Sequence, residues 1–340
     1  MKFRILPIIV LSAMTLPGCE GALQEEVFSQ YAPSTLLTTK VGIERVLFSA
    51  YGYAAINGNF GGNMQFQEEW TCDQFWETGG AVNQQYVPMA NFTFTSEYPT
   101  HWTTLWNRFY FGIRDCNIVL ENLDNAPIDD DTKKLLSAEA RFIRASIYFK
   151  ASSLWGAVPL KKSQSDPSDM ERTPADEIGK FVEEELLAIV NDLPEKGTKG
   201  YEYGRATKGA AQAYLMDYYL NTKQWQKCAD MADNIIKGGK YKLWNDYTTL
   251  FSADNERTND EYIWVYTCST LAGPGNEILN GAFPDDYKSM TDGSKVWTSN
   301  MRNWARMDRV LNSFYNTFDP QDIRRSCIIT EYLNSKGTKV

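Results

Sequence analysis

A helical hydrophobic repeat runs through most of the chain and constrains its fold more than any other feature. Over residues 39–56, apolar side chains such as Ile43, Leu47 and Ala54 recur at the spacing that places them on one face of a helix. A half-buried strand would instead alternate at every second residue. The repeat therefore predicts a mainly α fold. The other stretches with this period are residues 101–123, 132–155, 174–193, the segment after Thr207, and 225–236.

The last two predicted helices have the residue spacing of a tetratricopeptide unit. Small Ala211 and Ala229 would let two antiparallel helices approach closely. The bulky side chains that would fill the gaps are Tyr214, Tyr218 and Trp225. Earlier helix pairs follow this spacing more loosely. We therefore predict a tetratricopeptide-like helical scaffold, mainly over residues 39–56 and 101–240.

Two long stretches, residues 57–100 and 267–305, lack a sustained period and are rich in Gly, Asn and aromatic residues. Loops of this length inside a compact domain are usually functional or disordered. Around the second stretch the sequence predicts a strand over 261–266, a helix over 308–318, a strand over 327–333 and a turn over 334–337. Elsewhere, Thr173 is predicted to cap the helix at 174–193, with Pro174 in its first turn. The returning strand has barely begun at Val340, so we interpret the sequence as C-terminally truncated.

The N-terminus has the pattern of a lipoprotein signal. Lys2 and Arg4 precede an apolar run over residues 5–16, which is short for a helix that spans a bilayer. Small residues then precede Cys19, as the lipoprotein signal peptidase requires. We predict that residues 1–18 are removed and that acyl chains on Cys19 anchor the protein to a membrane. The alternative is an ordinary secretory signal with a chance cysteine.

Charge and residue content exclude several classes of function. The formal net charge is −9, and removal of the signal would make it more negative, so nucleic acid is an unfavourable partner. His101 is the single histidine and lies at a predicted helix start beside Trp102, which argues against a His-based triad and against a multi-His metal site. No phosphate-binding Gly-rich motif is present. The cluster over residues 254–260 lacks the spacing of a calcium loop. The sequence therefore predicts no cofactor and no metal.

Five ordered motifs resemble the SusD/RagB family of outer-membrane nutrient-binding lipoproteins. They lie at residues 138–160, 172–174 with 192–194, 204–211, 259–263 and 318–325. The resemblance implies that residues 19–340 form a SusD-like domain, with a tetratricopeptide-like layer and a more irregular part that carries the ligand site. It also implies a place at the outer membrane, facing the exterior, as a lid over a SusC-type TonB-dependent transporter that receives oligosaccharides or peptides. Family chains usually continue well past residue 340.

The ligand site is expected in the two irregular stretches. An aromatic ring can cover the apolar face of a sugar, and amide side chains can bind its hydroxyls. For any single ring the competing interpretation is that it packs the loop onto the helices. By contrast, Arg141, Arg144, Arg205 and Lys208 are interpreted as structural residues that pair with acids or cap helices. The predicted ligand-binding residues are Trp76, Asn83, Tyr86, Tyr287, Trp297 and Asn300.

Two other classes of function compete with non-catalytic glycan binding. A glycoside hydrolase needs a pair of carboxylates at a fixed separation, and acids such as Glu69, Asp73 and Asp286 are available. No catalytic motif surrounds them, so we predict that the protein is not an enzyme. A tetratricopeptide-type interaction scaffold would instead bind its partner in a groove on the helices, and a peptide-binding member of the same uptake system is a further alternative.

Overall fold

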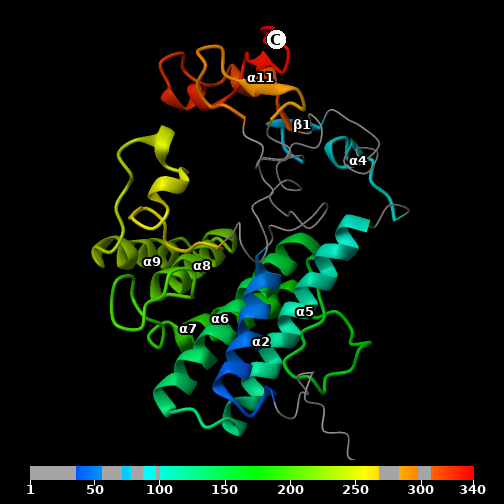
Figure 1. Ribbon diagram of the computed structural model, residues 1–340. Coiled ribbons are helices and arrows are strands. Elements are labelled where there is room, and N and C mark those ends of the chain that lie inside the picture. The colour runs from blue at the N-terminus through cyan, green and yellow to red at the C-terminus, as the bar shows by residue number, and fades with distance from the viewer. Residues whose placement is uncertain (1–35, 56–70, 78–86, 97–99, 268–282, 298–307) are drawn as a thin grey trace, which may run out of the picture.

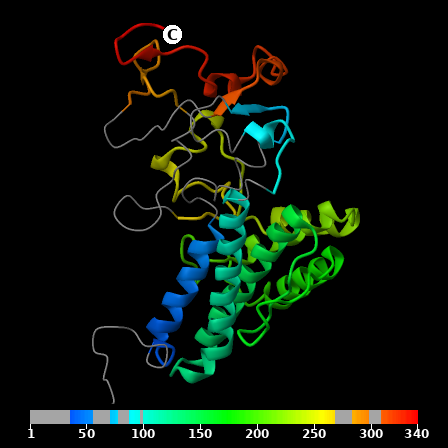
Figure 2. The same cartoon turned by 90° about the vertical axis from the view of Figure 1, so that its right-hand side faces the viewer.

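The computed structural model describes residues 36–55, 71–77, 87–96, 100–267, 283–297 and 308–340. The protein has two parts, a layer of long helices and a more irregular part with short strands above one end of it (Figures 1 and 2). The predicted signal, Cys19, Asn83, Tyr86 and Asn300 lie outside the described residues.

Among the described residues, six long helices form the helical layer. In chain order they are α2 (Lys40–Ala54), α5 (Thr100–Asn122), α6 (Asp130–Trp155), α7 (Ala175–Ile189), α8 (Lys208–Asn221) and α9 (Trp225–Lys237). Each helix packs against the next, and α2 also contacts α6. The mainly α prediction is confirmed, and each of these helices lies within a few residues of its predicted range.

The core lies where α2, α5 and α6 meet. Ile43, Leu47, Phe109 and Ile147 are buried at 1% exposure or less. Trp155, in the last turn of α6, contacts the ring of Phe109 edge to face, with centroids 5.9 Å apart. Burial of this apolar surface is the main stabilising contribution to the layer.

The helix ends follow from capping side chains, with one correction. The sequence predicts that a helix begins after Thr207, and in the structure the Thr207 hydroxyl accepts the backbone N–H of Ala210 and so caps α8. The predicted cap of α7 by Thr173 is wrong, because Pro174 occupies the N-cap position and no side chain caps that helix. Thr173 instead pairs through its backbone with Val158, at 3.2 and 2.9 Å, which ties the segment after α6 to the segment before α7.

Where the structure describes the irregular part, it contains two small antiparallel sheets. Strand β1 (Phe75–Glu77) pairs with β3 (Asp308–Val310), and β2 (Tyr287–Ser289) pairs with β4 (Leu333–Asn334). Each sheet therefore joins segments that are far apart in the sequence. The short helices are α4 (Val87–Ala90) and α11 (Asn312–Tyr315), and the 3-10 turns are η2 (Leu123–Asn125), η3 (Tyr247–Thr249), η4 (Ala253–Asn255) and η5 (Ile323–Cys327).

Three local predictions need correction here. The helix predicted over 308–318 begins as strand β3, and only Asn312–Tyr315 is helical. The strand predicted over 261–266 makes no ladder, because this segment lies on the helical layer, where Trp264 contacts Phe142 with centroids 4.9 Å apart. The strand predicted over 327–333 is a 3-10 turn at its start, and only its last residue joins β4.

The predicted turn near the end of the described chain is confirmed. The backbone N–H of Gly337 donates to Asn334 at 2.8 Å, and Gly337 has a φ of 76°, which favours glycine. Tyr332 and Val340 then exchange both backbone hydrogen bonds, at 3.1 and 2.9 Å. These contacts close a hairpin around the turn.

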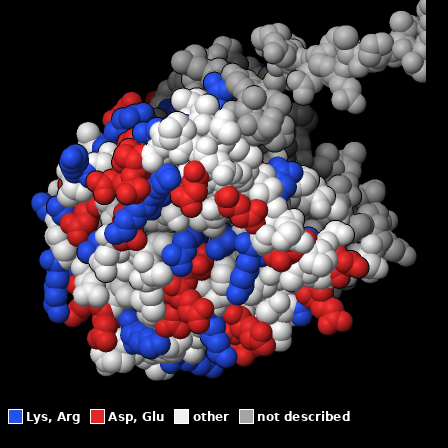
Figure 3. Space-filling view, turned by 90° about the horizontal axis from the view of Figure 1, so that it is seen from below, with Lys and Arg blue, Asp and Glu red and all other residues white. Residues whose placement is uncertain are grey.

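The end of the helical layer that faces away from the irregular part carries both signs of charge. Lys and Arg side chains alternate with Asp and Glu over the visible surface, without an extended field of one sign (Figure 3). Within the described ranges, no helix combines the length and the apolar character needed to cross a bilayer.

Candidate functional site

The β1–β3 ribbon places an aromatic ring beside a guanidinium group. In its register Trp76 lies opposite Arg309, and directly opposite residues of an antiparallel pair share a face of the sheet. The backbone N–H of Leu311 donates to Gln74 at 2.9 Å and extends this pairing by one step. Trp76 is 38% exposed, and Arg309 is also exposed. The ribbon therefore presents a ring and a cation together to solvent.

This pair suits the chemistry of a sugar. The indole ring can cover the apolar C–H face of a pyranose, and a guanidinium offers five fixed N–H donors to its hydroxyl groups. Arg309 was missed at the sequence level, because residues 308–318 read as one helix. The signal that identifies Arg309 is the strand register, and this register depends on a partner more than 200 residues away.

Two other predicted residues come together in an aromatic cluster around strand β2. The ring of Tyr287 lies 6.4 Å from that of Trp297, and Phe283 lies 4.9 Å from Tyr287 and 5.3 Å from Trp297. Tyr332, next to β4, adds a fourth ring 5.6 Å from Tyr287. The cluster fixes the loop after β2 onto the hairpin that ends the described chain.

Tyr287 and Trp297 differ in their access to solvent. Tyr287 is 4% exposed and its hydroxyl donates to the carbonyl of Lys295 at 2.9 Å, so its ring supports the loop from within. Burial raises the pKa of this hydroxyl. Trp297 is half-buried, and its backbone N–H donates to Lys288 at 2.8 Å. Of the two, Trp297 keeps ring surface that a ligand can reach.

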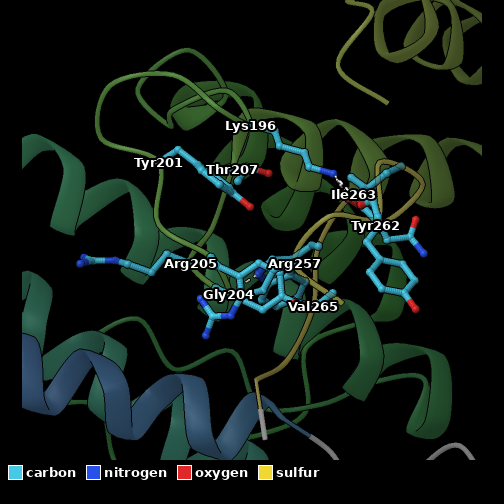
Figure 4. Close-up of a pocket in the computed structure, with 12 residues that line it drawn as sticks. Lys196, Tyr201, Gly204, Arg205, Thr207, Arg257, Tyr262, Ile263 and Val265 are labelled. Carbon is cyan, nitrogen blue, oxygen red and sulfur yellow. Dashed lines mark hydrogen bonds between the residues drawn. The ribbon is translucent and has the colours of Figure 1, made fainter. Parts of the chain in front are cut away.

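A separate hollow lies on the helical layer, between residues 196–207 and 257–265 (Figure 4). Its volume is about 300 Å³ when the solvent at its mouth is included. Lys196 donates to the carbonyls of Asn259 and Tyr262, at 2.9 and 3.3 Å, and so joins the two walls. Arg205 extends away from the hollow toward the helices. These two cations are therefore engaged in holding the walls and the layer together.

Arg205 belongs to a buried network that connects three segments. Its Nε lies 3.1 and 3.0 Å from the two carboxylate oxygens of Glu139 on α6. The Tyr51 hydroxyl of α2 donates to Glu139 at 2.8 Å and accepts the backbone N–H of Ala206 at 2.8 Å. Burial raises the pKa of the Glu139 carboxyl, and the charge of Arg205 offsets part of that shift. The predicted structural role of Arg205 is confirmed.

Three other cations in the motifs, interpreted above as structural, pair with acidic side chains as well. Arg141 and Arg144 both pair with Glu185 of α7, and Lys208 lies 3.5 Å from Glu195. The described residues contain no group of three or more His, Cys, Asp or Glu side chains placed to hold a metal ion. The motif residues thus build the scaffold, and the solvent-facing aromatic residues of the irregular part remain as the candidate site.

The fold of this chain is shared with SusD-like proteins of known structure. The structure is similar to that of a laminarin binding SusD-like protein, with a TM-score of 0.73 and 22% identity over 85% of this chain and 66% of the other. It is also similar to surface glycan-binding protein A from Bacteroides thetaiotaomicron in complex with laminarihexaose, with a TM-score of 0.70 and 20% identity over 85% and 63% of the two chains.

Residues 28–220 match the SusD-like family described as "Starch-binding associating with outer membrane", and the chain belongs to this family. The SusD-like protein P25 of Formosa agariphila is 24% identical over 92% of this chain and 60% of its own length. The starch-binding protein SusD of Bacteroides thetaiotaomicron is 28% identical over 52% of this chain and 32% of its own. The chain therefore spans about 60% of the length of its relative P25.

Proposed function

We propose that the protein binds oligosaccharides at the cell surface, without chemical conversion, and delivers them to a SusC-type TonB-dependent transporter. The observation that carries this proposal is the solvent-facing Trp76 beside Arg309 on the β1–β3 ribbon. Such a pair provides both the apolar contact and the hydrogen-bond donors that a sugar ring needs. Trp297 supplies further ring surface, and Tyr287 supports it from below. Asn83, Tyr86 and Asn300 complete the proposed set of ligand-binding residues.

The named relatives support a glycan as the ligand. One similar structure is that of a laminarin binding SusD-like protein and another is a complex with laminarihexaose, while a third relative is a starch-binding protein. All three are named for binding rather than for catalysis. The family is described as associating with the outer membrane. We propose that acyl chains on Cys19 supply this association and that the protein faces the exterior.

A glycan panel tests the proposal directly. The chain from residue 20 onward is titrated with laminarihexaose, maltoheptaose and soluble mannan, fructan and host-type glycans, and binding is followed by Trp fluorescence. New reducing ends are measured in the same samples. Saturable binding to one glycan class without new reducing ends is the expected result. Steady release of reducing ends, or silence across the panel from a folded chain, contradicts the proposal.

The site is tested with a matched pair of variants. Trp76→Ala removes the ring on the ribbon. The matched variant is Trp225→Ala, on α9, because Trp225 is 60% exposed and is therefore more exposed than Trp76. We expect Trp76→Ala to weaken glycan binding strongly and Trp225→Ala to leave it unchanged. Unchanged binding by both variants would place the glycan elsewhere on the protein.

The outer face of α9 favours a second candidate function, a protein-interaction scaffold. Trp225 and Ile236, 60% and 72% exposed, lie on this last helix of the layer. An amphipathic helix or peptide can bind to such a face. This function predicts that the glycan panel is silent and that Trp225→Ala removes binding of a partner, whereas Trp76→Ala does not.

A further inference from the structure

The hollow on the helical layer is lined by cations and by no acidic side chain. Its lining residues, all within the described ranges, include Lys196, Arg205 and Arg257 and no Asp or Glu. The whole chain, by contrast, has 43 acidic and 34 basic residues. Cations that gather in a small concave site raise its positive potential and attract anions. The hollow is therefore a candidate site for a negatively charged ligand.

Arg257 differs from the other two cations in its partners. Arg205 pairs with Glu139 on the side away from the hollow, and Lys196 donates to two backbone carbonyls. Arg257 has only a distant ion pair, with its Nε 3.8 Å from Oε1 of Glu256, and the two side chains are 73% and 53% exposed. Such an exposed pair is weak. Since Arg257 donates no hydrogen bond to another described residue, its guanidinium is available to a ligand.

The ring of Tyr203 holds this guanidinium in position. The central carbon of the guanidinium lies 5.1 Å from the centre of the ring. The Tyr203 hydroxyl donates to the backbone carbonyl of Glu256 at 3.1 Å, which fixes the ring to the residue before Arg257. A guanidinium that lies over a ring keeps the N–H groups at its edge free, because they point outward in its own plane. Tyr203 and Arg257 come from different walls, so their contact joins the two walls.

Tyr201 supplies a second hydrogen-bond donor. Its side chain and that of Arg257 line the hollow from opposite walls (Figure 4). The Tyr201 hydroxyl makes no hydrogen bond to another described residue. Burial raises the pKa of this hydroxyl, and the charge of Arg257 offsets part of that shift, so the phenol keeps its proton at neutral pH. It can therefore donate to an anion that the guanidinium binds.

A carboxylate matches this arrangement of donors. Its two oxygens can accept the paired N–H groups of a guanidinium, and one of them can also accept the phenol. The rings of Tyr203 and Tyr262 offer apolar surface for the carbon atoms that carry the carboxylate. The hollow has a volume of about 300 Å³ with the solvent at its mouth included, which is small for a ligand pocket. A ligand of one sugar or one amino-acid residue is therefore the size that fits.

We propose that the hollow binds the carboxylate of a small molecule, of the size of one sugar or amino-acid residue, through Arg257 and Tyr201. This second site is built from residues other than those of the β1–β3 ribbon and binds a charged group. It goes beyond the proposed glycan binding and does not depend on it. Since the two donors come from different walls, a bound carboxylate also joins residues 196–207 to residues 257–265 and should stabilise the folded protein.

Four small probes separate the charge of the ligand from its carbon skeleton. Glucuronate carries a carboxylate on a sugar, and N-acetylglycine carries one on an amino acid. Glucose has the same ring as glucuronate without the charge, and sulfate is an anion without a carbon skeleton. Binding to the chain from residue 20 onward is measured by isothermal titration calorimetry at low ionic strength. The rise in melting temperature with each probe is a second measurement.

Three variants test the two donors, and a fourth is the control. Arg257→Gln removes the charge, Arg257→Lys keeps the charge without the fork of donors, and Tyr201→Phe removes only the hydroxyl. The control is Arg324→Gln, because Arg324 is also exposed and lies 5.3 Å from the ring centre of Phe318, but does not line the hollow.

We expect Arg257→Gln to weaken carboxylate binding by about ten- to a hundredfold, because it removes charge-assisted hydrogen bonds. Tyr201→Phe should weaken binding by about two- to tenfold, since it removes one hydrogen bond. Arg257→Lys should lie between Arg257→Gln and the wild type, and Arg324→Gln should bind like the wild type. A wild-type protein that binds glucuronate or N-acetylglycine but not glucose supports the site. The tighter of the two carboxylates then identifies the source of the ligand.

Three results would overturn the inference. A folded wild type that binds neither carboxylate has no such site. Glucose or sulfate that binds as tightly as the carboxylates would show that the hollow does not select a carboxylate. Unchanged affinity in Arg257→Gln would place the carboxylate elsewhere on the protein. These results are distinct from a failure of the proposed function, because Arg257→Gln should bind the neutral glycan identified in the panel like the wild type.

Discussion

The guanidinium of Arg144 on α6 lies 2.7 Å from the carboxylate of Glu185 on α7. Arg141, one turn earlier on α6, contacts the other oxygen of the same carboxylate at 2.9 Å. Arg144 also donates to the side chain of Asn117 on α5 at 2.7 Å. Since Arg144 and Glu185 are both nearly buried, this contact fixes the positions of three helices relative to one another.

Glu185→Ala should destabilise the protein strongly. The substitution leaves a buried guanidinium without its partner, and breaking a buried ion pair in this way costs about 3–5 kcal/mol. Chemical denaturation followed by far-UV circular dichroism measures the change. Lys180→Ala on the same helix is the control, because its pair with Asp176 spans 3.8 Å and is well exposed. Equal denaturation midpoints for the two variants would contradict the structural role of Glu185.

Most of the helical layer could be predicted from the sequence, because its signal is local. The apolar period of α2 or α6 is visible in any window of two or three turns, and Thr207 identifies the start of α8. Thr173 was misread because the chain uses it for a β-bridge to Val158. That contact involves another segment, so a local capping rule does not detect it.

Alanine substitutions at Gly112 of α5 and at Gly52 of α2 should change the free energy of unfolding in opposite directions. A Cβ on Gly112 would lie 2.6 Å from Ile147 Cδ1 of α6 and 3.1 Å from Tyr53 Cβ of α2, so Gly112→Ala forces packed helices apart. We expect Gly112→Ala to lower the free energy of unfolding by about 1–3 kcal/mol. A Cβ on Gly52 meets nothing within 4 Å, so Gly52→Ala should stabilise α2 by about 0.5–1 kcal/mol. Thermal unfolding of both variants measures this, and a shift of the same sign in both would contradict the packing argument.

Asp166 should make the stability of the protein depend on pH in the acid range. Its carboxylate accepts the backbone N–H groups of Ser163 and Lys162, at 2.9 and 2.6 Å, and these bonds hold its pKa below the usual range. An unfolded aspartate titrates near about 3.9. Because the folded pKa is the lower one, the stabilisation is present above the unfolded pKa and is lost as the pH falls through the folded pKa.

The measurement is urea denaturation of the wild type and Asp166→Ala at about pH 7, pH 4 and pH 2.5. At neutral pH the wild type should have a higher free energy of unfolding than Asp166→Ala. This difference between the two proteins should be smaller at the two acid pH values. The control is Asp169→Ala, at an exposed carboxylate that makes no hydrogen bond to another described residue. An advantage of the wild type that stays constant with pH would contradict this assignment.

The candidate site was less predictable than the helices, for a physical reason. Trp76 stood out from its sequence neighbours, whereas Arg309 acquires its position only when β3 pairs with β1. Tyr287 and Trp297 were both predicted to bind the ligand, yet the structure buries Tyr287 beneath Phe283 and Tyr332. Side-chain exposure in irregular segments depends on long-range contacts, and no local period encodes it.

Trp76 and Arg309 should act on the same sugar ring, and this can be measured as a coupling energy. Trp76→Ala should weaken binding of the glycan identified in the panel by more than about tenfold, because buried aromatic contacts dominate binding energy. Arg309→Ala should weaken it less, and Arg309→Lys should recover only part of the loss, because an ammonium lacks the fixed fork of donors. If both side chains contact one ring, the double variant loses less than the sum of the single losses, by about 0.5 kcal/mol or more. Strictly additive losses would assign the two residues to different sugar positions, and wild-type affinity in both single variants would remove the ribbon from the site.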